Sequence, residues 1–103
     1  PAREAVDACK LVLSHVSDFL ETPCADYNSY WVKHRIEEAF GAYIPNGAVI
    51  QAAVELGLSV QSLDGPNVEF YVGEQVMLDA VTAAQVQCKK ELVSQWIDDA
   101  LDV

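Results

Sequence analysis

The last quarter of the chain limits the fold most, because residues 74–101 contain neither glycine nor proline. Apolar residues recur there every three or four positions, which is the spacing of one helix face: Met77, Val81, Ala84, Cys88, Leu92 and Trp96. An unbroken helix over this run would be about 42 Å long, whereas a globule of this chain length is only about 33 Å across. We therefore expect the helix either to bend near residues 82–85 or to project and pack on a partner.

Length and composition predict a single domain over residues 1–103. The chain has 103 residues, of which 51% are hydrophobic, so it can bury a core of its own. Residues 1–73 would form a helical core with a hairpin, and residues 74–103 would form the last helix. No apolar run approaches the roughly 20 residues that a membrane span requires, and no signal segment opens the chain. We expect a cytoplasmic protein that does not bind membranes.

The charge balance is strongly acidic. Sixteen Asp and Glu residues oppose six Lys and Arg residues, which gives a net charge of −10. A free duplex or an anionic membrane surface would be repelled by this average field, which disfavours a general nucleic-acid-coating role.

Some segments of the chain show the helical period of three to four residues and others show the strand period of two. Together these segments predict a mainly helical α+β fold with a two-stranded hairpin. Helices are expected over residues 2–21, 30–40 and 46–56, with Ser29 and Asn46 as caps and Gly41 and Gly57 as stops. The first helix would bury a stripe that includes Cys9, Val12, Val16, Phe19 and Leu20. Residues 22–29 are rich in turn formers and are expected to be irregular. Residues 58–72 alternate with period two around a Gly-Pro turn and predict the hairpin.

This order of elements resembles the winged helix-turn-helix family. The second helix supplies Ile36, Ala39 and Phe40, the turn is Gly41–Pro45, the third helix supplies Val49, Ala53 and Leu56, and residues 58–72 form the wing. The resemblance implies a third helix that enters the major groove of DNA. Its expected outward positions carry no Lys or Arg: Gly47, Ala48, Gln51, Ala52 and Glu55. The wing carries Asp64 and Glu69 instead of cations, so direct DNA recognition is disfavoured.

A second resemblance concerns two strings, Tyr27-Asn-Ser-Tyr-Trp-Val-Lys-His and Tyr43-Ile-Pro-Asn-Gly-Ala-Val-Ile-Gln-Ala-Ala. They are similar to a pattern in short, uncharacterised proteins of phages and plasmids, which implies a mobile-element origin but no activity.

The sequence offers little that points to catalysis or to a metal. The three cysteines, Cys9, Cys24 and Cys88, form no CxxC pair and are expected to be free thiols in a reducing compartment. His34 and Glu37 have ligand spacing, but a metal site needs further ligands, so we expect neither a metal nor a cofactor. An enzyme that uses Cys24 or His34 is a third hypothesis, behind two binding functions, because no catalytic motif surrounds either residue.

Two groups of residues are candidates for partner binding. Tyr27, Tyr30 and Trp31 form an aromatic cluster of a type enriched at protein interfaces, although Trp31 has an alternative role in packing against the first or last helix. The C-terminal acids Asp98, Asp99 and Asp102 oppose the helix dipole, which suggests either a basic partner or a contribution to solubility.

Together these patterns predict a non-enzymatic, acidic protein-binding module. Its sharpest version is a mobile-element-encoded inhibitor, or nucleic-acid mimic, that occupies a basic groove of a host defence complex. The expected partner-binding residues are Tyr27, Tyr30, Trp31, Glu55, Asp64, Glu69, Asp98, Asp99 and Asp102.

The alternative is a DNA-binding regulator that uses Lys33 and Arg35 and forms a homodimer through its first and last helices. A single positive patch beside the third helix would favour this alternative, and its members would be Lys10, Lys33, Arg35, Lys89 and Lys90.

Overall fold

A computed structural model describes residues 2–62 and 65–101. Asp64 and Asp102, both expected at the binding surface, lie outside these residues. The described chain forms four helices and three strands, in the order α1 (Arg3–Leu13), β1 (Cys24–Asn28), α2 (Ser29–Phe40), α3 (Asn46–Glu55), β2 (Val60–Ser62), β3 (Val68–Phe70) and α4 (Glu74–Leu101). The predicted α+β class is confirmed.

Helix α1 ends eight residues before the predicted boundary, at Leu13 rather than Glu21. Cys9 and Val12 are buried as expected, but Phe19 and Leu20 are 54% and 48% exposed, so their assignment to the buried stripe was wrong. Beyond the helix, the Leu20 amide donates to the Tyr71 carbonyl at 2.7 Å, which holds this segment at the end of the sheet.

The cap of α2 is also one residue earlier than predicted. The Asn28 side chain accepts from the Trp31 amide at 3.0 Å, whereas Ser29 is the first helical residue. The Ser29 hydroxyl is fully buried and accepts from the Val68 amide at 3.0 Å, which ties the start of α2 to β3. Gly41 ends α2 as predicted, because its φ of 64° is the left-handed conformation that glycine adopts without strain.

Helix α3 begins after Pro45, and Asn46 lies inside the helix rather than capping it. The Asn46 amide nitrogen donates to the Pro66 carbonyl at 3.0 Å, so this residue holds the start of α3 against the hairpin.

The sheet has three strands rather than the predicted two, in the order β1-β3-β2. The hairpin of β2 and β3 is antiparallel, as expected, with Val60 opposite Phe70. Strand β1 joins the other edge of β3, with Cys24 opposite Phe70 and Asn28 opposite Glu69, and the register shifts between these two pairs. Residues 24–28 lack a strand pattern of their own, and the free edge of β3 provides their hydrogen-bonding partners.

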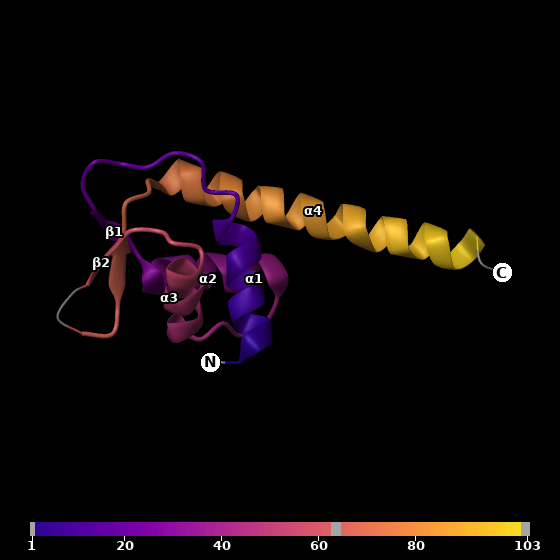
Figure 1. The fold of residues 1–103 in the computed structure, drawn as a ribbon, viewed down its shortest axis with the longest axis horizontal. Coiled ribbons are helices and arrows are strands. Elements are labelled where there is room, and N and C mark those ends of the chain that lie inside the picture. The colour runs from indigo at the N-terminus through magenta and orange to yellow at the C-terminus, as the bar shows by residue number, and fades with distance from the viewer. Residues whose placement is uncertain (1, 63–64, 102–103) are drawn as a thin grey trace.

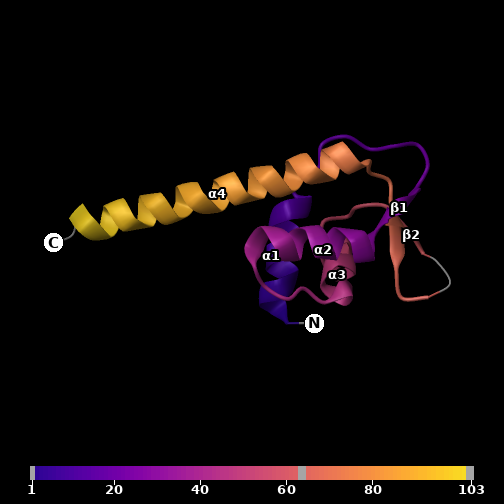
Figure 2. The ribbon, with the colours of Figure 1, turned by 180° about the vertical axis from the view of Figure 1, so that it is seen from behind.

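The core lies between α1, α2, α3, the inner face of the sheet and the first half of α4. Its largest fully buried side chains include Leu13, Ile36, Phe70 and Met77. Figure 2 shows α1, α2 and α3 gathered beneath the first half of α4, with the sheet at one end. Helix α4 packs on both α1 and α2.

Helix α4 is continuous from Glu74 to Leu101, so the expected bend near residues 82–85 is absent. The helix projects, as the alternative predicted, and its packing on a partner stays a prediction. Figure 1 shows its second half extending well beyond the globule, and the molecule measures 56 × 26 × 23 Å. The last buried residue is Ala84, and residues 89–101 are all exposed. None of the described helices combines the length and the apolar character that crossing a membrane would require.

Candidate protein-interaction surfaces

The outer face of α3 differs from the one that the sequence predicted. Ala48 and Ala52 were expected to point outward, but both are 0% exposed and belong to the core. The exposed positions of α3 are Gly47, Gln51, Val54 and Glu55, and none of them is basic. This helix therefore offers no cation to a phosphate.

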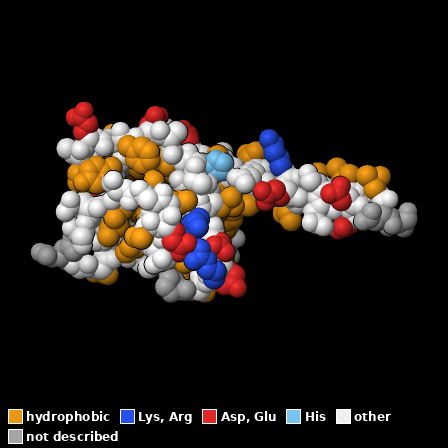
Figure 3. Space-filling model, viewed as in Figure 1, with side chains coloured by type: hydrophobic (Ala, Val, Ile, Leu, Met, Phe, Trp, Pro, Cys, Tyr) orange, Lys and Arg blue, Asp and Glu red, His pale blue; other side chains and the backbone are white. Residues whose placement is uncertain are grey.

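Glu55, a predicted partner-binding residue, is already occupied by cations of the same chain. Its carboxylate accepts from Arg3 Nη1 at 2.8 Å, from Lys10 Nζ at 3.2 Å and from Gln51 Nε2 at 3.0 Å. The bonds from Arg3 and Gln51 lower the pKa of Glu55 to about 2, with Lys10 acting in the same direction. Figure 3 shows this cluster as the mixed blue and red side chains over α1. Glu55 thus joins α1 to α3 rather than facing a partner.

The other two cations of the globule are also paired within the chain. Lys33 is 8% exposed, and its ammonium donates to the Ile44 carbonyl at 3.2 Å and pairs with Glu37 at 3.5 Å. Its charge also lies 4.8 Å from the centre of the Tyr43 ring, which stabilises the buried ammonium. Arg35 pairs with Glu38 at 2.8 Å.

The five cations named above as a possible DNA-binding surface do not meet. Lys10 is at the α1–α3 contact, Lys33 is buried in α2, and Lys89 and Lys90 are on the projecting half of α4. Lys89 and Lys90 are the two cations without an ion pair among the residues that the structure describes.

The aromatic cluster divides between two sides of α2. The Tyr27 and Trp31 rings meet edge to face with centres 4.9 Å apart, and Trp31 is half-buried against the core. Tyr30 is 53% exposed and stacks edge to face on His34 instead. Trp31 therefore packs on the core, and Tyr30 is the most exposed of the three.

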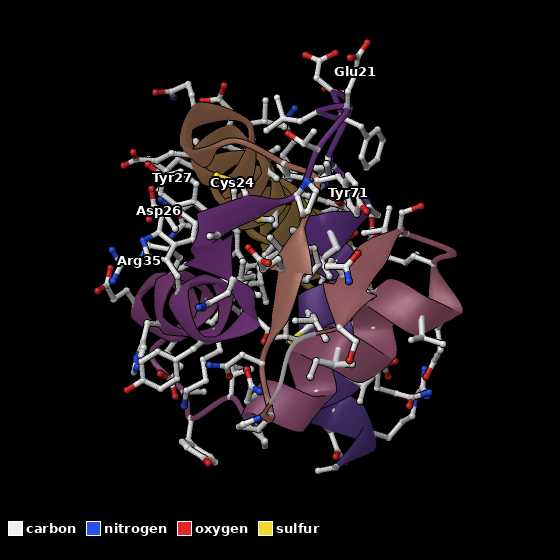
Figure 4. The ribbon with its side chains drawn as sticks, turned by 90° about the vertical axis from the view of Figure 1, so that its left-hand side faces the viewer. Glu21, Cys24, Asp26, Tyr27, Arg35 and Tyr71 are labelled. Atoms are coloured by element: carbon white, nitrogen blue, oxygen red, sulfur yellow. The ribbon has the colours of Figure 1, made fainter. Side chains whose placement is uncertain are left out.

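Carboxylates without a cationic partner among the described residues lie on β1, in the loop before it and on the start of α4 that β1 contacts. The Tyr27 hydroxyl donates to Glu74 at 2.8 Å, and this bond, with burial and the charges of Glu74 and Asp26, raises the pKa of Tyr27. Figure 4 shows Asp26 and Tyr27 projecting from β1, with Glu21 at the outer end of the preceding loop. We call Glu21, Asp26 and Glu74 the β1 acidic surface. Sequence reasoning placed Glu21 on the first helix, Asp26 in an irregular segment and Glu74 at the start of the last helix, so it did not group them.

The remaining described acids among the predicted binding residues lie on two other elements. Glu69 lies on the central strand β3 between Asn28 and Gln61 and is half-buried. Asp98 and Asp99 are exposed on the projecting half of α4. Among the described residues, the predicted binding residues are thus spread over β1, α2, α3, β3 and the projecting half of α4.

A shallow apolar pocket of about 430 Å³ lies where the loop after α1 meets the start of β2. Phe19, Leu20, Leu58 and Tyr71 contribute to its walls. Sequence analysis could not find it, because Phe19 and Leu20 continue the helical stripe of α1 and are indistinguishable from core residues.

Catalytic and metal-binding groups are dispersed. Among the described residues, no three of His, Cys, Asp or Glu are placed to hold a metal ion. His15 bonds Gln87 at 2.7 Å, and His34 contacts Glu37 at 2.9 Å. Cys9 is fully buried, which raises its pKa to about 12, and Cys24 is half-buried.

Comparison of this chain with protein-family models, with curated proteins and with solved structures finds no match.

Proposed function

We propose that this chain is a non-enzymatic, acidic protein-binding module that acts in the cytoplasm on a variant of the winged helix-turn-helix fold. Helices α2 and α3, joined through residues 41–45 and followed by the β2–β3 hairpin, support that fold. Strand β1 adds to the hairpin at the edge away from β2, so it leaves the helix-turn-helix unit unchanged.

One observation supports the binding function: the cations of the globule are all paired within the chain, whereas several of its acids have no cationic partner among the described residues. Arg3, Lys10, Lys33 and Arg35 all form ion pairs within the chain. The β1 acidic surface has no Lys or Arg partner among the described residues. A partner therefore meets uncompensated negative charge here, and it would have to supply the cations itself.

The complementary partner is a groove lined by Lys and Arg, of the kind that holds a nucleic-acid backbone. Occupying such a groove excludes the nucleic acid, so the module would act as an inhibitor. The sharpest form of the proposal is a mobile-element-encoded inhibitor of a host defence complex. The exposed side chains of Phe19 and Leu20 would add apolar contact beside the charged one.

Displacement of nucleic acid tests this function directly. Host proteins retained on heparin are fractionated, each fraction is loaded with a fluorescent random duplex or single strand, and the chain is added. We expect release of the nucleic acid from one fraction, without binding of the chain itself to either strand form.

Matched charge reversals locate the surface. Glu21→Lys or Asp26→Lys should weaken the release by about tenfold or more, because each places like charges together in the complex. Glu4→Lys makes the same charge change on exposed α1 and should release nucleic acid as the unchanged chain does.

Two results would reject the proposal. Release from no fraction excludes an inhibitor of nucleic-acid binding. A direct shift of the duplex by the chain that weakens steeply with salt would instead establish the DNA-binding regulator.

A further inference from the structure

The projecting half of α4 has an apolar side that the globule does not use. In the first half of the helix, Ala84 faces the core. Val93 follows it by nine residues, or about two and a half helical turns, and therefore lies on the opposite side. Val86, Val93, Ile97 and Ala100 share this side, and the first three are 45%, 54% and 46% exposed.

Larger apolar side chains border this strip on both margins. Trp96, 72% exposed, lies on one margin, and Leu101, 77% exposed, lies on the other. We call the six residues together the α4 strip: Val86, Val93, Trp96, Ile97, Ala100 and Leu101. An amphipathic helix with a strip of this width normally buries it against another element, and the globule lies on the other side.

Charges on the same half-helix identify the occupant. Lys89 and Lys90, the cations without an ion pair among the described residues, sit within the strip near its start. Asp98 and Asp99 sit near its end and also lack a cation there. A pattern that is positive at one end and negative at the other complements a reversed copy of itself.

We propose that the α4 strip binds the same strip of a second copy of this chain in an antiparallel pair. With the twofold axis at the level of Ser94, Lys89 is level with Asp99 of the second copy and Lys90 is level with Asp98. Lys89 and Asp99 both lie toward the Trp96 margin, whereas Lys90 and Asp98 both lie toward the Leu101 margin. Equal margins meet across such an axis. The two lysines lie within the strip and the two aspartates lie beyond its margins, so each long lysine side chain would extend around the second helix to reach its aspartate.

The same charges disfavour the parallel arrangement, because it sets Lys89 of one copy near Lys90 of the other and Asp98 near Asp99. Within the described residues the overlap covers residues 87–101, so Val86 lies just outside it. This overlap spans about 22 Å, which is short for a permanent dimer. We therefore expect a dissociation constant in the micromolar range. Helix α1 is not part of this contact, because its exposed residues are the charged Arg3, Glu4 and Asp7.

Light scattering across a concentration series measures the association. The unchanged chain should approach twice its monomer mass of 11.3 kDa. Val93→Asp should remain monomeric, whereas Gln95→Asp, which adds the same charge on the opposite side of the helix, should still associate. Residues 89–101 are exposed in the single chain, so both variants should melt at the temperature of the unchanged globule.

An exchange of charges distinguishes the two directions of pairing. The variant K89E/K90E and the variant D98K/D99K should each lose self-association, and the variant with all four changes should regain it. Antiparallel pairing predicts that the four-change variant does not pair with the unchanged chain, because lysine then meets lysine. Parallel pairing predicts the reverse.

These outcomes test the antiparallel pair independently of the proposed function. A chain that stays monomeric up to about 1 mM has no such interface. Equal association of Val93→Asp and Gln95→Asp would show that another surface pairs the copies. Preferential pairing of the four-change variant with the unchanged chain would overturn the antiparallel arrangement.

Discussion

Ser29→Ala removes a single hydroxyl that holds the first residue of α2 to the start of β3. The Ser29 side chain is 0% exposed, and it accepts from the Val68 amide at 3.0 Å. Val68 is 8% exposed, so water has poor access to the amide that the substitution leaves without a partner. An unsatisfied buried donor costs about 1–3 kcal/mol, and we expect the free energy of unfolding to fall by this amount.

Thermal unfolding followed by circular dichroism measures the effect. For a domain of this size, each kcal/mol lowers Tm by about 5 °C, so the expected decrease is about 5–15 °C. Ser59→Ala is the matched control, since Ser59 is exposed and its hydroxyl makes no hydrogen bond among the described residues. If Ser29→Ala lowers Tm by no more than about 2 °C beyond the control, the Ser29–Val68 bond does not hold the two elements together.

Three further outcomes follow from the structure. Because the bonds from Arg3 and Gln51 lower the pKa of Glu55 from 4.5 to about 2, its carboxylate contributes stability above about pH 4.5 that is lost as the pH falls toward 2. The Glu55→Gln variant should therefore lose less Tm than the unchanged chain between pH 4.5 and 2. If the two chains show the same dependence of Tm on pH, the ion pairs of Glu55 do not stabilise the fold. Burial raises the pKa of Cys9 to about 12, so a thiol reagent at pH 8 should label Cys24 and Cys88 and reach Cys9 only after unfolding; rapid labelling of all three thiols would refute this. Ending the chain after Cys88 should preserve the Tm of the globule, which a calorimetric scan can check, and a large decrease would show that the projecting half supports the core.

Periodicity predicted those parts of the fold that local sequence decides. Gly41 ends α2 because the left-handed conformation favours glycine, and the spacing from Met77 onward predicts the long last helix. The hairpin of β2 and β3 was predicted from alternation and a turn in the same way.

Contacts between distant residues decided the rest. Nothing local ends α1 at Leu13, since the apolar stripe continues to Leu20, and the Leu20–Tyr71 bond depends on the folded sheet. Strand β1 likewise exists because β3 has a free edge, and residues 24–28 alone give no sign of it.

The candidate surfaces were predictable in composition but not in position. The excess of acids over bases indicated which charge would be exposed, yet Glu55 was assigned to a partner because Arg3 lies 52 residues away in the chain. The pairing of all four globule cations, which carries the proposed function, is a property of the folded structure. Lys89 and Lys90 could be distinguished from the four paired cations only once the structure had shown the ion pairs of those four.

The straight course of α4 divides one helix into two halves with different protection from solvent. The first half can exchange its amide hydrogens only when the globule unfolds, because Met77, Ala80 and Ala84 are buried. The second half has only its own backbone bonds, and a free helix of that length is marginally stable in water. Exchange rates over residues 89–101 should therefore slow as the chain becomes more concentrated, which makes these amides a direct measure of how much of the protein is bound.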